Sequence, residues 1–378
     1  MERLIPPEWF VDMHWTLLLV IAAAATYGLM TGADWLVHAA SRLARRVGVP
    51  KVVVGATIVS LGTTSPECAV SVVAAWHGRA GLALGNAVGS IVADSGLIFG
   101  LGCLMAVLPA DRFLLTRQGW VQFGAAVLLA TLCYVSYALF GPQAVLGRGV
   151  GVLFLLLLSV YLAMSVRWSR QRLSTSGDKA AKTSGSEDDP SAIPPVAVPG
   201  PEDLQLEVVQ PDEERPLQNS AVWLLTLIGV GVAVVVLTSH VLIVSVSELA
   251  RQFGVPHVVI AATMVALGTS MPELVVGLSA VRHGHPELLV GNVIGADVLN
   301  VLFVVGASAV AAPLPILDPG ARLPAIFLIV HLPTMLAVLV LFRLYIWKAC
   351  RQGHFQRWMG LPLLVMYCLY VVIQYALG

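Results

Sequence analysis

The chain has 378 residues, of which 57% are hydrophobic and only 12% charged, and its formal net charge is zero. Soluble domains carry about 25% charged residues, so this composition excludes an ordinary soluble protein and favours a membrane protein. The five cysteines lie in or beside apolar segments without CxxC spacing, which indicates packing residues rather than disulfides or metal ligands. We expect no resident cofactor and no nucleic-acid partner.

Apolar segments follow one another along most of the chain. A membrane-spanning helix needs roughly 20 mostly apolar residues. The acidic, proline-containing start, 1–12, lacks the basic region of a cleavable signal peptide. We therefore predict an all-α membrane protein with ten transmembrane helices, over 14–31, 52–76, 83–108, 120–140, 147–166, 220–246, 258–281, 288–312, 323–342 and 358–377.

A polar segment, 167–219, separates the first five spans (1–166) from the last five (220–378). Its core, Ser174–Pro216, is rich in Ser, Pro, Gly, Asp and Glu and poor in aromatic residues. A segment of that composition cannot bury a hydrophobic core. We predict a disordered linker between two five-helix units.

Basic residues predict the orientation of the chain in the membrane. If the N-terminus lies outside and ten spans alternate, 17 of the 22 Lys and Arg residues lie in inside loops and helix ends, against 5 outside. Cytoplasmic loops carry the excess of basic residues in membrane proteins. We expect a protein of the cell membrane with both termini outside and the linker in the cytoplasm.

An internal repeat relates the two halves. Residues 48–100 align with 254–306 without a gap, and 23 of the 53 positions are identical. The repeats belong to two motif regions, 48–108 and 254–312. Because each half contains an odd number of spans, the second half enters the membrane from the opposite side. Inverted repeats are typical of secondary transporters, whose substrate lies between the repeats near the midplane.

The first motif pair is GTTSPE at 62–67 and GTSMPE at 268–273, each inside an apolar span. Proline has no amide hydrogen and clashes with the carbonyl four residues before it. Each span should therefore break at the motif and release carbonyl groups, which is tolerated at membrane depth only beside a cavity or ligand. Oxygen ligands surround the break, in the hydroxyls of Thr63, Thr64, Thr269 and Ser270 and the carboxylates of Glu67 and Glu273.

The second motif pair is GNAVGSIVAD at 85–94 and GNVIGADVLN at 291–300. It places Asp94 27 residues after Glu67, and Asn300 27 residues after Glu273. An ionisable residue at the centre of a membrane helix costs at least about 2.5–3.5 kcal/mol. Carboxylates gathered at one depth therefore need cations between them, and hard oxygen ligands suit calcium or sodium rather than zinc or copper.

Structural alternatives exist for these residues. A buried glutamate can simply cap a half-helix N-terminus, and Asp94 and Asn300 can simply bond across helices. The two GxxxG runs favour close helix packing over ligand binding. Asp297 is either an extra ligand or a residue facing a water-filled vestibule.

The two GT(T/S)xPE motifs, each followed by GNxxG and a polar residue, resemble the alpha repeats of the sodium/calcium exchanger family of cation antiporters. The resemblance covers both repeats and the ten-span layout. It implies that Glu67 and Glu273 are the central acidic ligands, that Asp94 and Asn300 form the other side-chain pair, and that hydroxyls help to bind the ions. These hydroxyls are those of Thr63, Thr64, Thr269, Ser270 and Ser90.

The chain departs from the family pattern in two places. The family usually has Gly-Ser-Asn within the second motif, whereas here Ser90 is followed by Ile91 and the second copy reads Ala296-Asp297. The Asp and Asn of the other pair also stand in the reverse order to that of several relatives. Both changes concern the sodium sites and the coupling ion more than the divalent site.

The sequence therefore predicts an antiporter, not an enzyme, that exchanges Ca²⁺ or a similar divalent cation for Na⁺. H⁺-coupled or K⁺-dependent exchange is the alternative. An ion channel with broken helices is less consistent with inverted repeats. An intramembrane hydrolase is disfavoured because no HExxH motif is present. The predicted partners are the lipid bilayer and the transported ions.

Overall fold

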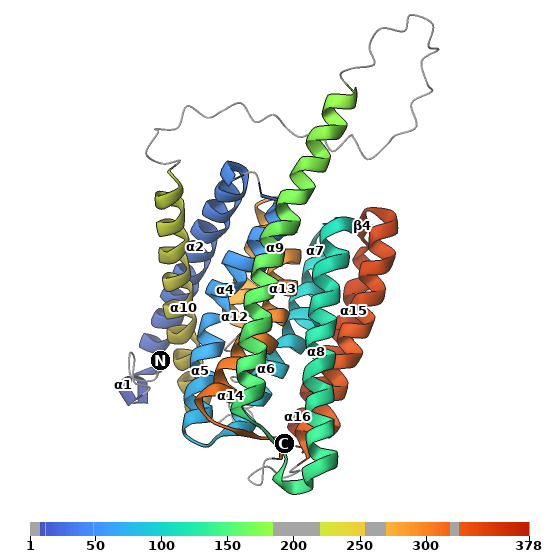
Figure 1. Cartoon of the computed structure of the whole chain (residues 1–378). Coiled ribbons are helices and arrows are strands. Elements are labelled where there is room, and N and C mark those ends of the chain that lie inside the picture. The colour runs from blue at the N-terminus through green and yellow to red at the C-terminus, as the bar shows by residue number, and fades with distance from the viewer. Residues whose placement is uncertain are drawn as a thin grey trace, which may run out of the picture.

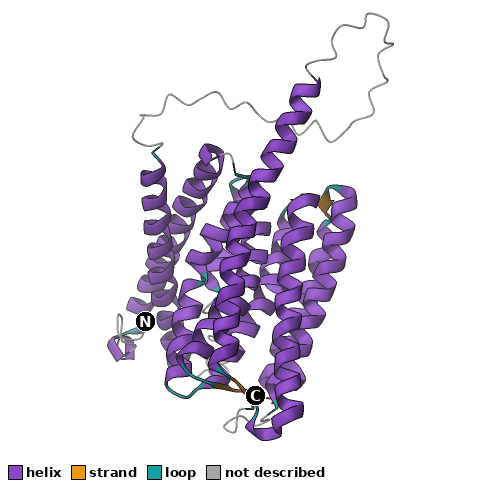
Figure 2. Ribbon diagram, viewed as in Figure 1, coloured by secondary structure: helices purple, strands orange, loops and turns teal. Residues whose placement is uncertain are grey.

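The computed structural model describes residues 8–11, 13–47, 49–183, 220–253, 270–317 and 325–377, most of them in long helices (Figure 2). The first half contains α1 (Glu8–Val11), α2 (Trp15–Val47), α3 (Lys51–Val54), the π-helical η1 (Gly55–Val59), α4 (Ser60–Thr63), α5 (Ser65–Trp76), α6 (Ala80–Val92), the π-helical η2 (Ala93–Ile98), α7 (Phe99–Met105), β1 (Leu108–Pro109), α8 (Arg112–Phe140), η3 (Gly141–Gln143), β2 (Val145–Leu146) and α9 (Arg148–Thr183).

The second half repeats this order of elements. It contains α10 (Ala221–Gln252), α12 (Met271–Arg282), α13 (Pro286–Leu299), the π-helical η5 (Asn300–Val305), α14 (Gly306–Ala311), β3 (Leu314–Pro315), the π-helical η6 (Phe327–His331), α15 (Leu332–Gln352), β4 (His354–Phe355), η7 (Arg357–Met359) and α16 (Gly360–Leu377).

Eight helices of the described residues are long and apolar enough to cross a membrane. The bent pair Lys51–Thr63 and Ser65–Trp76 makes a ninth span if it is taken as one. The predicted span at 258–281 falls partly on 254–269, outside the described residues. The chain is thus an all-α membrane protein whose strands are all two residues long within the described ranges, and its ten-span layout of inverted repeats is consistent with these helices.

Local sequence explains where several helices begin and end. The Asp111 carboxylate accepts hydrogen bonds from the amides of Phe113 and Leu114 and so caps α8, while Ser220 caps α10 through the amide of Trp223. Side-chain oxygens at these positions satisfy amides that have no partner inside the helix. Gly353 ends α15 in the left-handed region at φ 81°, a conformation that glycine adopts without steric cost.

Each of two short antiparallel ribbons pairs a strand of the first half with a strand of the second. β1 of the first half pairs antiparallel with β4 of the second, and β2 pairs with β3 in the same way. The two ribbons lie at opposite ends of the bundle in Figure 2. Equivalent elements of the two repeats therefore face opposite directions, as inverted repeats require.

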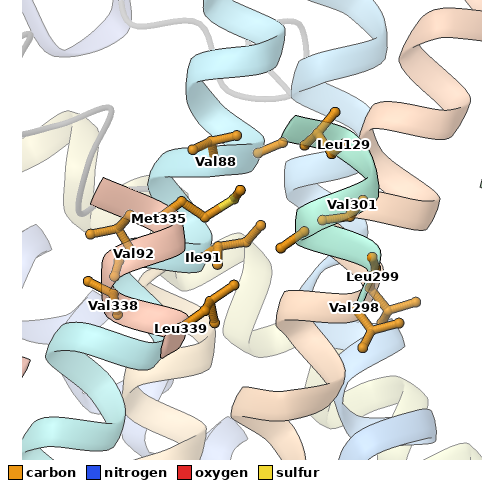
Figure 3. Packing of buried hydrophobic residues seen from close by; sticks show 14 of the residues in the cluster. Val88, Ile91, Val92, Leu129, Val298, Leu299, Val301, Met335, Val338 and Leu339 are labelled. Atoms are coloured by element: carbon orange, nitrogen blue, oxygen red, sulfur yellow. The ribbon is translucent and has the colours of Figure 1, made fainter. Parts of the chain in front are cut away.

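α2 and α10 form a pair at one side of the bundle, where they lie alongside each other (Figure 1). Small residues allow the close approach, because a Cβ on Gly231 would lie 3.1 Å from the carbonyl oxygen of Gly32. The remaining helices enclose a larger apolar cluster, part of which is shown in Figure 3.

The structure corrects the predicted start of the linker. α9 runs as one helix from Arg148 to Thr183, so the first part of the predicted linker 167–219 is helical. Its first residues, 167–173, include several Arg and a Gln, which are good helix formers, whereas Ser174–Asp178 are poor ones and local propensity does not explain the helix there. The rest of the predicted linker, 184–219, lies outside the described residues.

Candidate ion-binding site

The first motif forms the predicted break in its span. α4 ends at Thr63 and α5 begins at Ser65, and the two parts are bent by 43°. Pro66 occupies the first turn of α5, as expected from a residue that cannot donate a helical hydrogen bond. Glu67 lies in the same turn. The positive end of the α5 dipole therefore stabilises a negative charge on Glu67.

The second motif repeats this arrangement as far as it is described. α12 begins at Met271, with Pro272 and Glu273 in its first turn. Ser270 precedes the helix and is buried, with an exposed fraction of 4%. Thr269 lies outside the described residues, so the break itself is described in the first repeat alone.

The two glutamates meet between the repeats. Thr64 Oγ1 donates a hydrogen bond of 3.1 Å to Glu273 Oε1 across the pseudo-symmetry axis, and the Thr63 side chain also approaches Glu273. Glu67 is close enough to Glu273 and to Asp94 to be repelled by both carboxylates. Both oxygens of Glu67 and Oε2 of Glu273 are buried without a hydrogen-bond partner among the described residues.

Asp94 and Asn300 meet in the same interior. Asn300 Nδ2 donates to Asp94 Oδ2 at 3.4 Å, and the remaining oxygen of each side chain is buried without a described partner. Both residues lie at the start of π-helical segments, η2 and η5. π-helical turns inside α-helices occur frequently at functional sites. The two side chains that the resemblance pairs are therefore in contact.

Neighbouring polar residues hold the broken helix in place. Asn86 Nδ2 donates to Ser71 Oγ at 2.9 Å and approaches the backbone carbonyl of Glu67 at 3.4 Å. Ser90 is buried on α6, one turn before Asp94. Asn86 thus fixes the first turn of α5 from the neighbouring helix.

Close helix packing at the second GxxxG run is also observed. A Cβ on Gly291 would collide with the carbonyl of Val52, and one on Gly295 would lie 2.5 Å from the Cα and carbonyl oxygen of Ala56. These two glycines let α13 pack directly against η1 and α3 of the other repeat. The region that would face Gly85 and Gly89 by repeat symmetry falls on 258–262, outside the described residues.

No three His, Cys, Asp and Glu side chains of the described residues are arranged to hold a metal ion by themselves. The buried carboxylates are instead interspersed with hydroxyl and amide groups. Unpartnered buried carboxylate oxygens are costly in a low-dielectric interior. Cations bound among these oxygens would lower that cost.

Two further residues join this interior that the motifs did not indicate. Ser95 and Gln122 both bond to Asp297, whose role the sequence left open. Gln122 lies in an apolar span outside the repeated motifs, and a polar residue in such a span was the available signal.

A family model described as sodium/calcium exchanger protein matches residues 17–167 and 223–376.

The chain belongs to the sodium/calcium exchanger family. It is 28% identical to the inner membrane protein YrbG of Escherichia coli over 89% of this chain and 91% of that protein. It is 26% identical to the sodium/calcium exchanger MaX1 of Methanosarcina acetivorans over 92% of this chain and 95% of that protein.

A solved structure has the same fold. The sodium/calcium exchanger from Methanococcus jannaschii superimposes with a TM-score of 0.70 over 95% of this chain and 99% of that chain, at 21% identity. Membership of the family makes the protein an integral membrane cation antiporter rather than an enzyme.

Proposed function

We propose that this exchanger moves Ca²⁺, or a divalent cation of similar size, in exchange for Na⁺ by alternating access. The observation that carries the proposal is the meeting of Glu67 and Glu273 at two helix N-termini, with three buried carboxylate oxygens lacking described partners. Such oxygens are the ligands that hard cations prefer.

The proposed ligands are those that the resemblance implies. They are Glu67, Glu273, Asp94, Asn300, Thr63, Thr64, Thr269, Ser270 and Ser90. Glu67, Asp94 and Glu273 together carry about −3 when ionised, which one divalent cation leaves partly uncompensated and three monovalent cations neutralise. Competition between one divalent ion and several monovalent ions for the same oxygens gives exchange.

Hydroxyl groups favour sodium as the coupling ion. Proton binding to carboxylates needs no additional oxygen ligands, whereas the bond from Thr64 to Glu273 brings a hydroxyl oxygen to the carboxylate. The second candidate is H⁺-coupled or K⁺-dependent exchange, because buried carboxylates also bind H⁺ and K⁺. The ion gradient that drives calcium movement distinguishes these candidates.

We further propose the cell membrane as the location, with both termini outside and the central segment in the cytoplasm. The C-terminal end of α9 and the start of α10 lie at one end of the bundle, and α1 and the end of α16 lie toward the other (Figure 1). The basic residues of the inside loops support this orientation. The proposed units remain 1–166 and 220–378, with 167–219 between them.

The test is ⁴⁵Ca²⁺ uptake into proteoliposomes driven in turn by Na⁺, K⁺ and H⁺ gradients. We expect outward Na⁺ gradients to drive uptake at fixed pH with the proton gradient collapsed. Glu67→Gln and Glu273→Gln should each reduce uptake at least about tenfold while the purified protein keeps its helical content. Uptake that follows an imposed pH gradient and ignores Na⁺ would contradict sodium coupling, and wild-type uptake by either variant would remove that glutamate from the site.

A further inference from the structure

A second polar cluster lies beside the proposed site. Asp297 on α13 accepts hydrogen bonds at its Oδ2 from Ser95 Oγ and from Gln122 Nε2, both at 2.5 Å. All three side chains are at least 97% buried. They come from three elements, α13, η2 and α8, so the cluster exists only in the folded protein.

One carboxylate oxygen of this cluster makes no described hydrogen bond. Asp297 Oδ1 is buried and has no hydrogen-bond partner among the described residues. Its carboxylate is also close enough to Asp94 for the two charges to repel each other. Two donors fix the carboxylate through Oδ2, and the second oxygen therefore has a set position but no described ligand. A cation bound at that oxygen would compensate the charge of the buried carboxylate.

Repeat symmetry shows that the fold does not require a polar residue at two of these positions. At the offset of 206 residues, which holds over 48–100, the counterparts of Asp297 and Ser95 are Ile91 and Val301, both apolar. Both are buried as well, each with an exposed fraction of 0%.

Figure 3 shows Ile91 and Val301 among the packed apolar side chains. The same place in the pseudo-symmetric half is thus filled by hydrocarbon. Packing alone therefore does not require the carboxylate of Asp297 and the hydroxyl of Ser95 at these positions.

We propose that Asp297, Ser95 and Gln122 form an additional binding site for one monovalent cation, Na⁺ in the first place, beside the proposed divalent site. A single carboxylate with neutral oxygen ligands balances one positive charge, whereas Ca²⁺ usually recruits several carboxylates. The site is separate from the glutamates but connected to them. Ser95 follows Asp94 in η2, and Asp297 lies one turn before Asn300.

Because the two sites are neighbours, ion binding at one should change ion binding at the other. A cation at Asp297 shields Asp94 from the repulsion of the Asp297 carboxylate. Occupancy of the additional site should therefore change how strongly the Asp94–Asn300 pair holds its own ion. The inference goes beyond the proposed exchange, because the glutamate site could operate without it.

The experiment counts bound ions on the purified full-length protein at fixed pH. Equilibrium binding of ²²Na⁺ is measured without calcium, and ⁴⁵Ca²⁺ binding without sodium. Asp297→Asn removes the charge. The triple variant Asp297→Ile, Ser95→Val, Gln122→Leu installs the apolar repeat counterparts at the first two positions and an apolar residue of similar length at the third. Gln118→Leu, one turn earlier on α8 and also buried, is the matched control.

We expect both cluster variants to bind one Na⁺ fewer per molecule than wild type and to keep ⁴⁵Ca²⁺ affinity within about threefold, while Gln118→Leu binds the wild-type number. An unchanged sodium count in the folded variants would overturn the proposal. Joint loss of sodium and of calcium binding would also overturn it, because Asp297 would then belong to the divalent site. If the wild-type protein binds sodium but no calcium, the proposed calcium exchange is contradicted. The number of bound sodium ions still tests the additional site in that case.

Discussion

Thr64 joins the two repeats through a single hydroxyl. It lies at the break between α4 and α5, yet its hydrogen bond of 3.1 Å goes to Glu273 at the start of α12. The hydroxyl thus orients a carboxylate supplied by the other half of the chain. Its own repeat counterpart is Ser270, whose hydroxyl is buried without a described partner.

Removing this hydroxyl should weaken ion binding without unfolding the protein. Hydrogen bonds to charged groups contribute about 1.5–3 kcal/mol, so Thr64→Val should weaken Ca²⁺ binding about tenfold or more. Thr64→Ser keeps the hydroxyl and should stay within about threefold of wild type. Titration of ⁴⁵Ca²⁺ binding measures both variants, and equal affinities for Val and Ser at this position would show that the bond has no role in binding.

Asp94 and Asn300, which stand in the reverse order to that of several relatives, allow a test of whether the two side chains act as a pair. Asp94→Asn leaves two amides facing each other and removes one of three central charges, so Ca²⁺ binding should weaken at least about tenfold. Adding Asn300→Asp restores one carboxylate in contact with one amide. Because the two side chains touch at 3.4 Å, the double variant should recover most of the lost affinity. Losses that simply add in the double variant would show that the two positions do not act as a pair.

At the scale of elements, the helix break could be predicted because its cause is local. Pro66 disrupts its own helix wherever that helix packs, and the structure bends there by 43°. The π-helical starts at Asp94 and Asn300 could not be predicted in this way, since tertiary packing decides such turns. The bond from Gln122 to Asp297 was equally hidden, because it joins α8 to α13 across 175 residues of chain.

The extension of α9 into the polar segment could not be predicted from composition. Polar composition predicted disorder from 167, but the helix continues to Thr183, although good helix formers follow the apolar span only as far as 173. Composition separates segments that bury a core from those that do not, and it does not separate a polar helix from a polar coil.

Close packing of α13 against the first repeat gives a prediction at this scale. A Cβ on Gly295 would lie 2.5 Å from backbone atoms of Ala56, which cannot move aside as a side-chain tip can. Gly295→Ala should therefore destabilise the folded protein by about 1–3 kcal/mol. Gly124→Ala on α8 is the control, since nothing described lies within 4 Å of that position. Thermal unfolding in detergent compares the two, and equal melting temperatures would mean that α13 shifts freely.

At the scale of the molecule, the two ends of the bundle are not equivalent. α2 packs along α12, where Ser279 Oγ donates to Asp34 Oδ1 at 2.5 Å and His283 lies 3.6 Å from the same carboxylate. By repeat symmetry α10 should meet α5 in the same way, but no comparable contact occurs among the described residues. Val73, the counterpart of Ser279, is 54% exposed. The end at α12 is thus closed over by α2, and the end at α5 is not covered by α10.

Alternating access predicts that these two contacts form in turn. The α2–α10 pair would move against the other helices, breaking the Asp34–Ser279 contact and bringing His240 of α10 to Val73 of α5, which are their repeat counterparts. Paired cysteines at 34 and 279, after replacement of the native Cys350 and Cys368, should cross-link readily in the resting protein. The link should abolish ⁴⁵Ca²⁺ exchange, and reduction should restore it.

Paired cysteines at 73 and 240 serve as the matched control, because they report the opposite state. They should cross-link slowly in the resting protein and at least several-fold faster during sodium-driven turnover, when the second state is visited. Both cross-links would then trap the same exchanger at opposite ends of one movement. Full exchange with the 34–279 link in place would show that α2 need not leave α12, and a 73–240 link that never forms during turnover would show that α10 does not close over α5.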